Sequence, residues 1–357
     1  MRDKDTKSDH NSFNTSVHGL RGVASLMVFF AHLLGGPAEH IYSDRLGYVN
    51  GVVPFWNFGT YGVYLFFAIS GFVILPSVLR YSLKEFFVRR FLRIYPIFFV
   101  FTLLFVILNA ITNHIPDTNS LLPIFAGFTF LNLVVGTEQL TPNAWSLTYE
   151  VMFYALTALA VFLMVKKQSM IGAVLALGLS VAFVLAFPAA LFFLIGIITQ
   201  LMYQRGLLVT GHMKLGLELI AVVSLGIIAS MGHFGYKPSE ISDPIAQLTI
   251  LATAFYFYFA VGQTSLTSRA LNRQWILYFG SVSYSLYLVH PYIYLPLRLL
   301  FDKMGWFTEN ILLSMVIFII SVVIPTLTAT HLVHITLEKL PYKLLFKREI
   351  FSMSNKK

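Results

Sequence analysis

Two ionisable side chains, Arg21 and His32, lie inside the first long apolar stretch of this 357-residue chain. Their separation of eleven residues is close to three turns of an α-helix, so both project from one face, about 16 Å apart along the axis. Ionisable groups in a membrane span are costly and usually face a protein interior or a wet cavity, which makes the pair a candidate functional site. From this helix alone, a snorkelling arginine and a hydrogen-bonded core histidine explain the pair equally well.

A cluster of arginines, Arg89, Arg90 and Arg93, precedes the third apolar stretch. Arg90 and Arg93 are one helical turn apart, so two planar guanidinium groups can bind the same ligand, and this geometry suits phosphate. The alternative is an ordinary cytoplasmic anchor, since basic residues gather on that side of membrane proteins. Arg21 favours the phosphate site because we expect it at the same depth, where it adds another cation.

The fourth apolar stretch begins at Trp145 and Ser146 and places Glu150 about five residues into the span. A carboxylate there is expensive unless it is paired. His32 is expected at a comparable depth, so Glu150 is predicted to orient its imidazole and support a general base. The alternatives are a structural buried pair and a glutamate at the rim of the membrane. Trp145 alone fits an interfacial aromatic belt.

Hydroxyl and imidazole groups share one face of the ninth apolar stretch. Ser283 and Tyr287 are one turn apart, and His290 is two turns from Ser283. Such a face does not suit lipid, so it is expected to contribute to a polar site. Hydrogen bonding between helices is the alternative explanation.

The sequence excludes several kinds of chemistry. It has no cysteine, which removes disulfides, thiolate nucleophiles and Cys-ligated zinc. His331, His334 and Glu338 follow one another at helical spacing, but no further ligand is identifiable, so we expect no metal. It also has no Walker loop, dinucleotide fingerprint or nucleophile elbow. Chemistry must therefore come from histidine, carboxylate, hydroxyl and arginine groups.

The composition is that of an integral membrane protein, with 57% hydrophobic residues, 11% charged residues and a mean hydropathy of +0.74. Repeated apolar stretches of about twenty residues predict an all-α polytopic membrane protein rather than a barrel. The run 121–135 is short, so we expect it to be re-entrant or interfacial. The ten predicted crossings lie near residues 16–36, 55–78, 92–113, 145–165, 170–186, 189–205, 213–232, 246–264, 275–300 and 309–336.

Basic residues predict the orientation. With the N-terminus in the cytoplasm, the inner segments collect most lysines and arginines, and ten crossings return the C-terminus to the same side. The net charge of +9 is mostly this topology signal, so it points to membrane lipids or a phosphorylated ligand rather than nucleic acid. The expected organisation is a polar cytoplasmic N-terminus (1–15), one transmembrane domain (16–338) and a short basic cytoplasmic tail (339–357), with no fused extracytoplasmic domain.

Five motifs in chain order resemble the membrane-bound acyltransferase-3 family, whose members O-acetylate bacterial surface polysaccharides and related acceptors. The first is the arginine followed eleven positions later by histidine, here Arg21 and His32. The other four look like the family's Gly-Val-x-Leu-Phe-Phe-x-x-Ser-Gly-Phe, Arg-Arg-x-x-Arg-Ile-x-Pro, Trp-Ser-Leu-x-x-Glu and Ser-Tyr-Ser-x-Tyr-Leu-x-His blocks, at 62–72, 89–96, 145–150 and 283–290. The resemblance covers nearly the whole chain.

The resemblance implies an acyl-CoA donor, most often acetyl-CoA, and a hydroxyl-bearing glycan acceptor, free or lipid-linked, such as lipopolysaccharide O-antigen. It implies CoA phosphates bound by Arg21, Arg89, Arg90 and Arg93. His32 would be the general base supported by Glu150, or would first accept the acyl group itself. The residues expected to support the substrate or the structure are Trp145, Ser146, Ser283, Tyr287, His290 and Glu338.

The chain departs from the family at Glu338, which is followed by Lys-Leu-Pro where relatives often have Glu-x-Pro. The resemblance also implies the bacterial inner membrane, and it leaves the oligomeric state open, a homo-oligomer included. Two other interpretations fit the same polar residues. A transporter or flippase would use them as a substrate or proton pathway, and a structural membrane subunit would use them only for helix packing.

Overall fold

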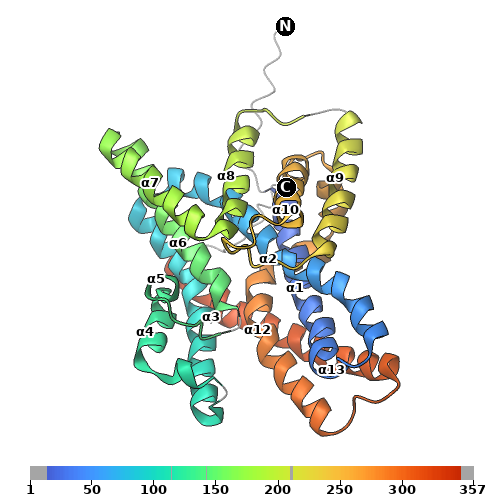
Figure 1. The fold of residues 1–357 in the computed structure, drawn as a ribbon. Helices are drawn as coiled ribbons and strands as arrows, with labels where there is room; N and C mark the ends of the chain where they lie inside the picture. The colour runs from blue at the N-terminus through green and yellow to red at the C-terminus, as the bar shows by residue number, and fades with distance from the viewer. Residues whose placement is uncertain (1–13, 114, 142, 210–211, 347–357) are drawn as a thin grey trace.

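The computed structural model describes residues 14–113, 115–141, 143–209 and 212–346, and the regular elements among them are all helical (Figure 1). Two π-helical segments, Phe162–Lys166 and His334–Lys339, continue α6 and α13. The helices are α1 (Thr15–His40), α2 (Leu46–Arg80), α3 (Leu83–Thr112), α4 (Leu121–Thr129), α5 (Asn132–Val135), α6 (Ala144–Val161), α7 (Met170–Ala186), α8 (Leu191–Gln204), α9 (His212–Met231), α10 (Pro244–Ala260), α11 (Leu266–Leu271), α12 (Gln274–Lys303), α13 (Ile311–Val333) and α14 (Leu340–Phe346).

Six of the described helices are long and apolar enough to cross a membrane, and a seventh crossing results if α7 and the segment Pro188–Gln204, bent by 118°, count as one. The predicted count of ten crossings is therefore not confirmed. Two of the expected spans show why. The 17 residues of α10 fall short of the roughly 20 needed to cross a bilayer, and α12 interrupts its apolar sequence with serine, tyrosine and histidine. The predicted re-entrant run forms the short helices α4 and α5.

Polar caps fix where the site-bearing helices begin. At the start of α1, the side chain of Asn14 accepts a hydrogen bond from the Val17 amide at 3.0 Å. At the start of α3, Ser82 Oγ accepts from the Glu85 amide at 3.2 Å. Such caps satisfy amide groups that have no partner within the helix. They fix the helical register from which the arginines of α1 and α3 project.

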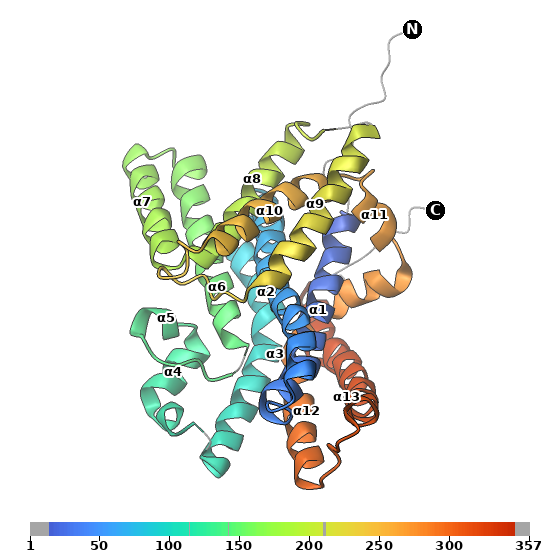
Figure 2. The same cartoon turned by 45° about the vertical axis from the view of Figure 1, so that its right-hand side comes forward.

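Helix α2 packs against α1 and α8 at the centre of the molecule (Figures 1 and 2). Its contact with α8 depends on two glycines. A Cβ atom on Gly71 would lie 2.0 Å from the Phe193 carbonyl oxygen, and one on Gly196 would lie 2.0 Å from the Ala68 carbonyl oxygen. Small residues let the backbones of membrane helices approach this closely. Gly71, the second glycine of the 62–72 block, therefore has a packing role.

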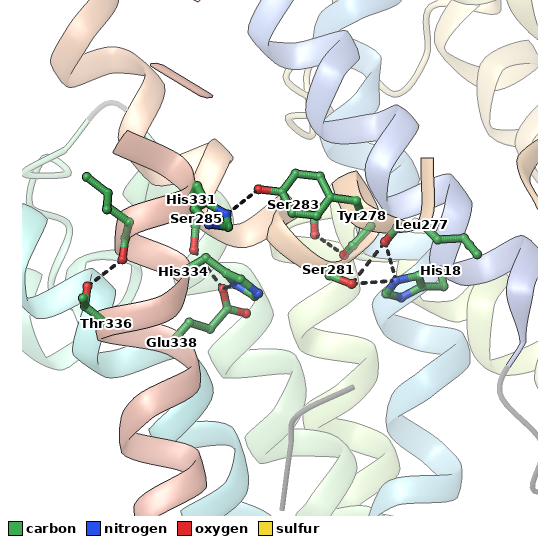
Figure 3. Close-up of polar contacts among 12 residues, drawn as sticks. His18, Leu277, Tyr278, Ser281, Ser283, Ser285, His331, His334, Thr336 and Glu338 are labelled. Carbon is green, nitrogen blue, oxygen red and sulfur yellow. Dashed lines mark hydrogen bonds and ion pairs between the residues drawn. The ribbon is translucent and has the colours of Figure 1, made fainter. Parts of the chain in front are cut away.

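The contact between α1 and α12 is built in the same way. A Cβ atom on Gly22 would lie 2.7 Å from the Gly280 amide nitrogen. Nearby, His18 Nε2 lies 2.9 Å from the Leu277 carbonyl oxygen and 3.2 Å from Ser281 Oγ (Figure 3). These contacts hold α1 against α12, the two helices that carry Arg21, His32 and the Ser283 to His290 block.

We expect Gly71→Ala to lower the free energy of unfolding by about 1–3 kcal/mol, because the added methyl group must separate α2 from α8. Gly178 on α7 is the matched control, since a Cβ atom there meets nothing within 4 Å. Gly178→Ala should be neutral or stabilising by up to about 1 kcal/mol through helix propensity. Thermal unfolding of both variants in one detergent measures the difference, and equal midpoints would contradict the close contact.

Candidate active site

Side chains from α1, α2, α3, α6 and α12 surround one cavity of about 590 Å³, its opening included. Apolar walls such as Phe66 and Ile69 of α2 alternate with a polar set. The polar set comprises Arg21, Ser70, Arg90, Arg93, Ser146, Glu150, Tyr154, Ser283, Tyr284 and Tyr287. Residues that are distant in the sequence thus share one cavity, which we call the central cavity.

Glu150 supplies the carboxylate of the central cavity. Ser70 Oγ donates a hydrogen bond to Glu150 Oε1 at 2.6 Å. The hydroxyl of Tyr154, one turn further along α6, donates to the same oxygen. Glu150 also interacts electrostatically with Arg21 and Arg90. Its negative charge therefore offsets part of the positive charge that this apolar bundle encloses.

Three guanidinium groups line the central cavity, those of Arg21, Arg90 and Arg93. Arg90 Nη2 donates to Ser77 Oγ at 3.0 Å, and its guanidinium carbon lies 5.2 Å from the centre of the Tyr154 ring. Arg21 and Arg93 are close enough for their like charges to interact. Cations gathered in this way suit a ligand with several negative charges, and guanidinium groups suit phosphate in particular.

Arg89 lies outside the central cavity, in contrast to the sequence prediction that groups it with the phosphate-binding arginines. Its Nη2 pairs with Glu85 at 2.6 Å, and its Nη1 donates to the Tyr342 hydroxyl at 2.5 Å. Its guanidinium carbon lies 4.2 Å from the centre of the Phe346 ring. Successive residues of a helix point about 100° apart, so Arg89 and Arg90 face different directions. Arg89 instead fastens α14 to α3.

Ser146 and Tyr287 meet in the central cavity, with their hydroxyl oxygens 2.7 Å apart. Asn143 donates its side-chain amide to the backbone carbonyl of Tyr287. That carbonyl lacks its usual helical donor because Pro291, four residues later, has no N–H group. Ser283 lines the same cavity and donates within α12. The start of α6 is therefore tied to the middle of α12.

His32 and His290 form a pair of imidazoles whose ring centres are 5.2 Å apart. His32 Nδ1 lies 2.8 Å from the Val28 carbonyl oxygen, and its ring centre is 5.3 Å from that of Trp56. His290 is fully buried, and its Nε2 has no hydrogen-bond partner among the described residues. The ring of His290 lies 6.1 Å from that of Tyr287, so the pair adjoins the central cavity.

The expected contact between Glu150 and His32 is not seen, because neither hydrogen-bonds to the other within the described part of the chain. The reason lies in the neighbours of each helix. α6 packs against α2, whereas α1 packs against α2 and α12. Glu150 therefore meets Ser70 of α2, and His32 meets His290 of α12. Similar depth in the membrane does not decide which helices touch.

Glu338 lies fully buried outside the lining of the central cavity. Ser285 Oγ donates to Glu338 Oε2 at 2.8 Å, and His334 Nδ1 is 2.7 Å from the same oxygen (Figure 3). His334 and Glu338 both belong to the π-helical segment that continues α13, and π-helical turns are frequent at functional sites. Glu338 also interacts electrostatically with Arg21. Glu338 therefore supports Arg21 electrostatically from outside the cavity lining.

Trp145 and His331 also lie outside the lining. Trp145 packs against aromatic rings, with centre distances of 6.2 Å to Phe67 and 5.9 Å to Tyr149. His331 Nδ1 lies 2.8 Å from the Tyr278 hydroxyl, away from Glu338 (Figure 3). Within the residues that the structure describes, no three histidine or acidic side chains gather closely enough to hold a metal ion.

Sequence reasoning misses Ser70, Tyr154 and Asn143 as site residues. Two of them carry a signal in the sequence. Ser70 belongs to the 62–72 block, and Tyr154 follows Glu150 by four residues, which places both on one face of a helix. The signal for Asn143 is indirect, because it depends on the carbonyl that Pro291 leaves free.

Comparisons with known proteins bear on this site. The model of the acyltransferase domain that defines the acyltransferase-3 family matches residues 14–330. An uncharacterized protein of Haemophilus influenzae is 26% identical over 208 residues, which cover 52% of this chain and 82% of that relative. No solved structure matches. Because the family model takes in most of the chain, including the arginines, the glutamate and the histidine pair, this protein belongs to the acyltransferase-3 family.

Proposed function

We propose that this acyltransferase moves an acetyl group from acetyl-CoA to a hydroxyl group of a surface polysaccharide, such as lipopolysaccharide O-antigen. The observation that carries the proposal is the central cavity, where Arg21, Arg90 and Arg93 line one space. The phosphate groups of CoA are the part of the donor that such a cluster binds best. The reaction class agrees with the family of the chain.

We assign the orientation from the charges. The arginine end of the central cavity faces the cytoplasm, where acetyl-CoA is available, and both termini lie on that side of a bacterial inner membrane. Support comes from the basic residues that flank this end, including Arg80, Lys84 and Lys166. The pantetheine arm then extends along α1 from Arg21 toward His32, about 16 Å further along the helix axis.

His32 acts as the general base in this proposal. Its Nδ1 lies next to the Val28 carbonyl, which accepts but cannot donate, so Nδ1 carries the proton and Nε2 is free to accept one. Nε2 removes the proton of the acceptor hydroxyl while the oxygen of that hydroxyl attacks the thioester carbonyl. The carbon–sulfur bond breaks, and the proton passes to the CoA thiolate. The buried ring of His290 holds the imidazole of His32 in place.

Glu150 has a different task from the one expected from its sequence position. We assign it to the donor end of the cavity, because its carboxylate is held by Ser70 and Tyr154 and interacts with Arg21 and Arg90. There it offsets positive charge and holds the arginines in place between turnovers.

Thioester turnover tests the reaction class. The full chain in lipid nanodiscs receives acetyl-CoA with a radiolabelled acetyl group and a hydroxyl-bearing glycan. We expect release of free CoA thiol together with label on the glycan. A transporter or flippase would move its substrate with the thioester intact, and that result would overturn the proposal.

Arg90→Gln should weaken CoA binding about 10- to 100-fold, the size expected when a charge-assisted hydrogen bond of about 1.5–3 kcal/mol is lost. Arg89→Gln is the matched control at the preceding residue, because Arg89 lies outside the cavity. It should leave CoA affinity unchanged. Titration of both variants with CoA measures the difference, and equal weakening would return the cluster to the role of a cytoplasmic anchor.

His32→Ala should lower kcat about 10²- to 10⁴-fold, the usual contribution of a general base, while CoA affinity stays within a factor of two or so. The control is His40→Ala on the same helix, whose side chain is half exposed and lies 3.7 Å from the Glu39 carboxylate. That variant should keep full activity. Acetyl transfer at saturating donor measures kcat, and full activity of His32→Ala would show that the reaction centre is elsewhere.

A further inference from the structure

Three aromatic rings follow one another where α1 ends and α2 begins. The ring centre of His32 lies 5.3 Å from that of Trp56, and the ring centre of Trp56 lies 6.0 Å from that of His233. His32 also interacts electrostatically with His233. His32 and Trp56 are partly exposed and His233 is exposed, whereas His290 is fully buried. The proposed base therefore has a second, accessible imidazole near it that no step of the mechanism uses.

His233 belongs to the segment 232–236, which follows α9 and is held against α2. The Tyr64 hydroxyl of α2 donates a hydrogen bond to the Phe234 carbonyl at 2.6 Å. The ring of Tyr236 lies 4.5 Å from that of Tyr64, and Tyr236 has φ +51°. A bulky residue rarely adopts this left-handed conformation, so the fold holds the segment in place at some cost. His233 therefore has a defined position.

The hydroxyl group of Thr60 determines which nitrogen of His233 carries the proton. Thr60 Oγ1 donates to the backbone carbonyls of Trp56 at 2.9 Å and Asn57 at 3.0 Å. The same oxygen lies 2.9 Å from His233 Nδ1. Because the one hydroxyl proton is directed at the carbonyls, Nδ1 donates to Thr60, and Nε2 of the neutral ring is left to accept a hydrogen bond.

We propose that His32 and His233 bind the same sugar ring of the acceptor, with His233 as a specificity-determining residue. His32 takes the proton of the hydroxyl that is acetylated, and His233 Nε2 accepts a hydrogen bond from a second hydroxyl of that ring. The apolar C–H face of the sugar packs on Trp56, which contacts both imidazoles. The inference rests on the proposed acetyl transfer with His32 as base.

The position and chemistry of the three rings support this ligand. In the proposed orientation they lie at the outer end of α1, where a surface polysaccharide is available. An alcohol with one hydroxyl satisfies His32 but leaves the accepting nitrogen of His233 unpaired. A site built to hydrogen-bond a substrate hydroxyl discriminates against an analogue that lacks it. The pair of histidines therefore favours a ring with several hydroxyls.

Two probes with the same six-membered ring test the second contact. Methyl β-xylopyranoside carries several ring hydroxyls, and tetrahydropyran-4-ol carries a single one. Each is given with acetyl-CoA to the full chain in nanodiscs, and the ester and free acetate are measured. We expect His233→Ala to lower kcat/KM for the xyloside about 2- to 10-fold, mainly through KM, which is the size of one lost hydrogen bond. It should leave kcat/KM for tetrahydropyran-4-ol unchanged.

Two further variants act as controls for His233→Ala. His233→Gln has a side-chain carbonyl that can accept from the same hydroxyl, so it should restore the preference for the xyloside. His40→Ala should leave both probes unchanged. CoA titration of each variant reports whether it folds and keeps the donor site. Equal losses for the two probes, no loss for either, or free acetate without ester from either probe would overturn the proposal.

Chemical modification of the unsubstituted protein gives a reading that needs no catalysis. Diethyl pyrocarbonate should modify His233 more slowly in the presence of methyl β-xylopyranoside than in tetrahydropyran-4-ol at the same concentration, as measured by peptide mass spectrometry. Equal rates of modification would contradict the site. Absence of any thioester cleavage in the first assay would count against the proposed function, and the modification rates would still decide whether His233 binds the sugar.

Discussion

An arginine enclosed within a bundle of apolar helices loses its hydration, and burying its charge is costly unless the protein supplies polar partners. Arg21, Arg90 and Arg93 all line the central cavity, so this cost constrains everything packed around them. Glu150 lines the cavity, and Glu338, outside the lining, interacts electrostatically with Arg21. Two carboxylates do not neutralise three guanidinium groups. The remaining positive charge favours an anionic ligand, which links the electrostatics of the bundle to its proposed donor.

The helices that carry these charges are held by contacts that allow little movement. The caps at Asn14 and Ser82 fix the starts of α1 and α3. The glycine contacts bring α12 against α1 and α8 against α2 at backbone distance. Backbones this close cannot shift without a clash, so the central helices form a rigid frame. The cavity walls that belong to this frame lose little conformational freedom when a ligand binds, which lowers the cost of binding.

The sequence supports accurate predictions where a single helix decides the outcome. The all-helical class and the shared face of Ser283 and Tyr287 follow from composition and helical period. Prediction from the sequence fails where the outcome depends on which helices are neighbours. The pairing of Glu150 with His32 is predicted from depth, but packing of α6 on α2 gives the carboxylate to Ser70.

Arg89 shows a second limit of sequence reasoning. The arginines on α3 look like one cluster in the sequence, yet neighbouring residues of a helix point in different directions. Arg89 instead contacts Tyr342 and Phe346 of α14, which is distant in the sequence. No local sequence pattern predicts that α14 packs against α3. The predicted count of ten crossings is not confirmed for a related reason, because burial against other helices lets α12 carry polar residues that a lipid-facing span could not.

Tyr287 stands between the two halves of the proposed active site. It lines the central cavity, and its ring is 6.1 Å from that of His290, whereas His32 and His290 are not part of the lining. Under the proposed mechanism the thioester must therefore pass Tyr287 to reach His32. The Tyr287 hydroxyl is tied to the Ser146 hydroxyl, and breaking one such hydrogen bond costs about 0.5–1.5 kcal/mol. Under the proposed mechanism, the Tyr287 side chain therefore has to turn away from Ser146 before donor and base can meet.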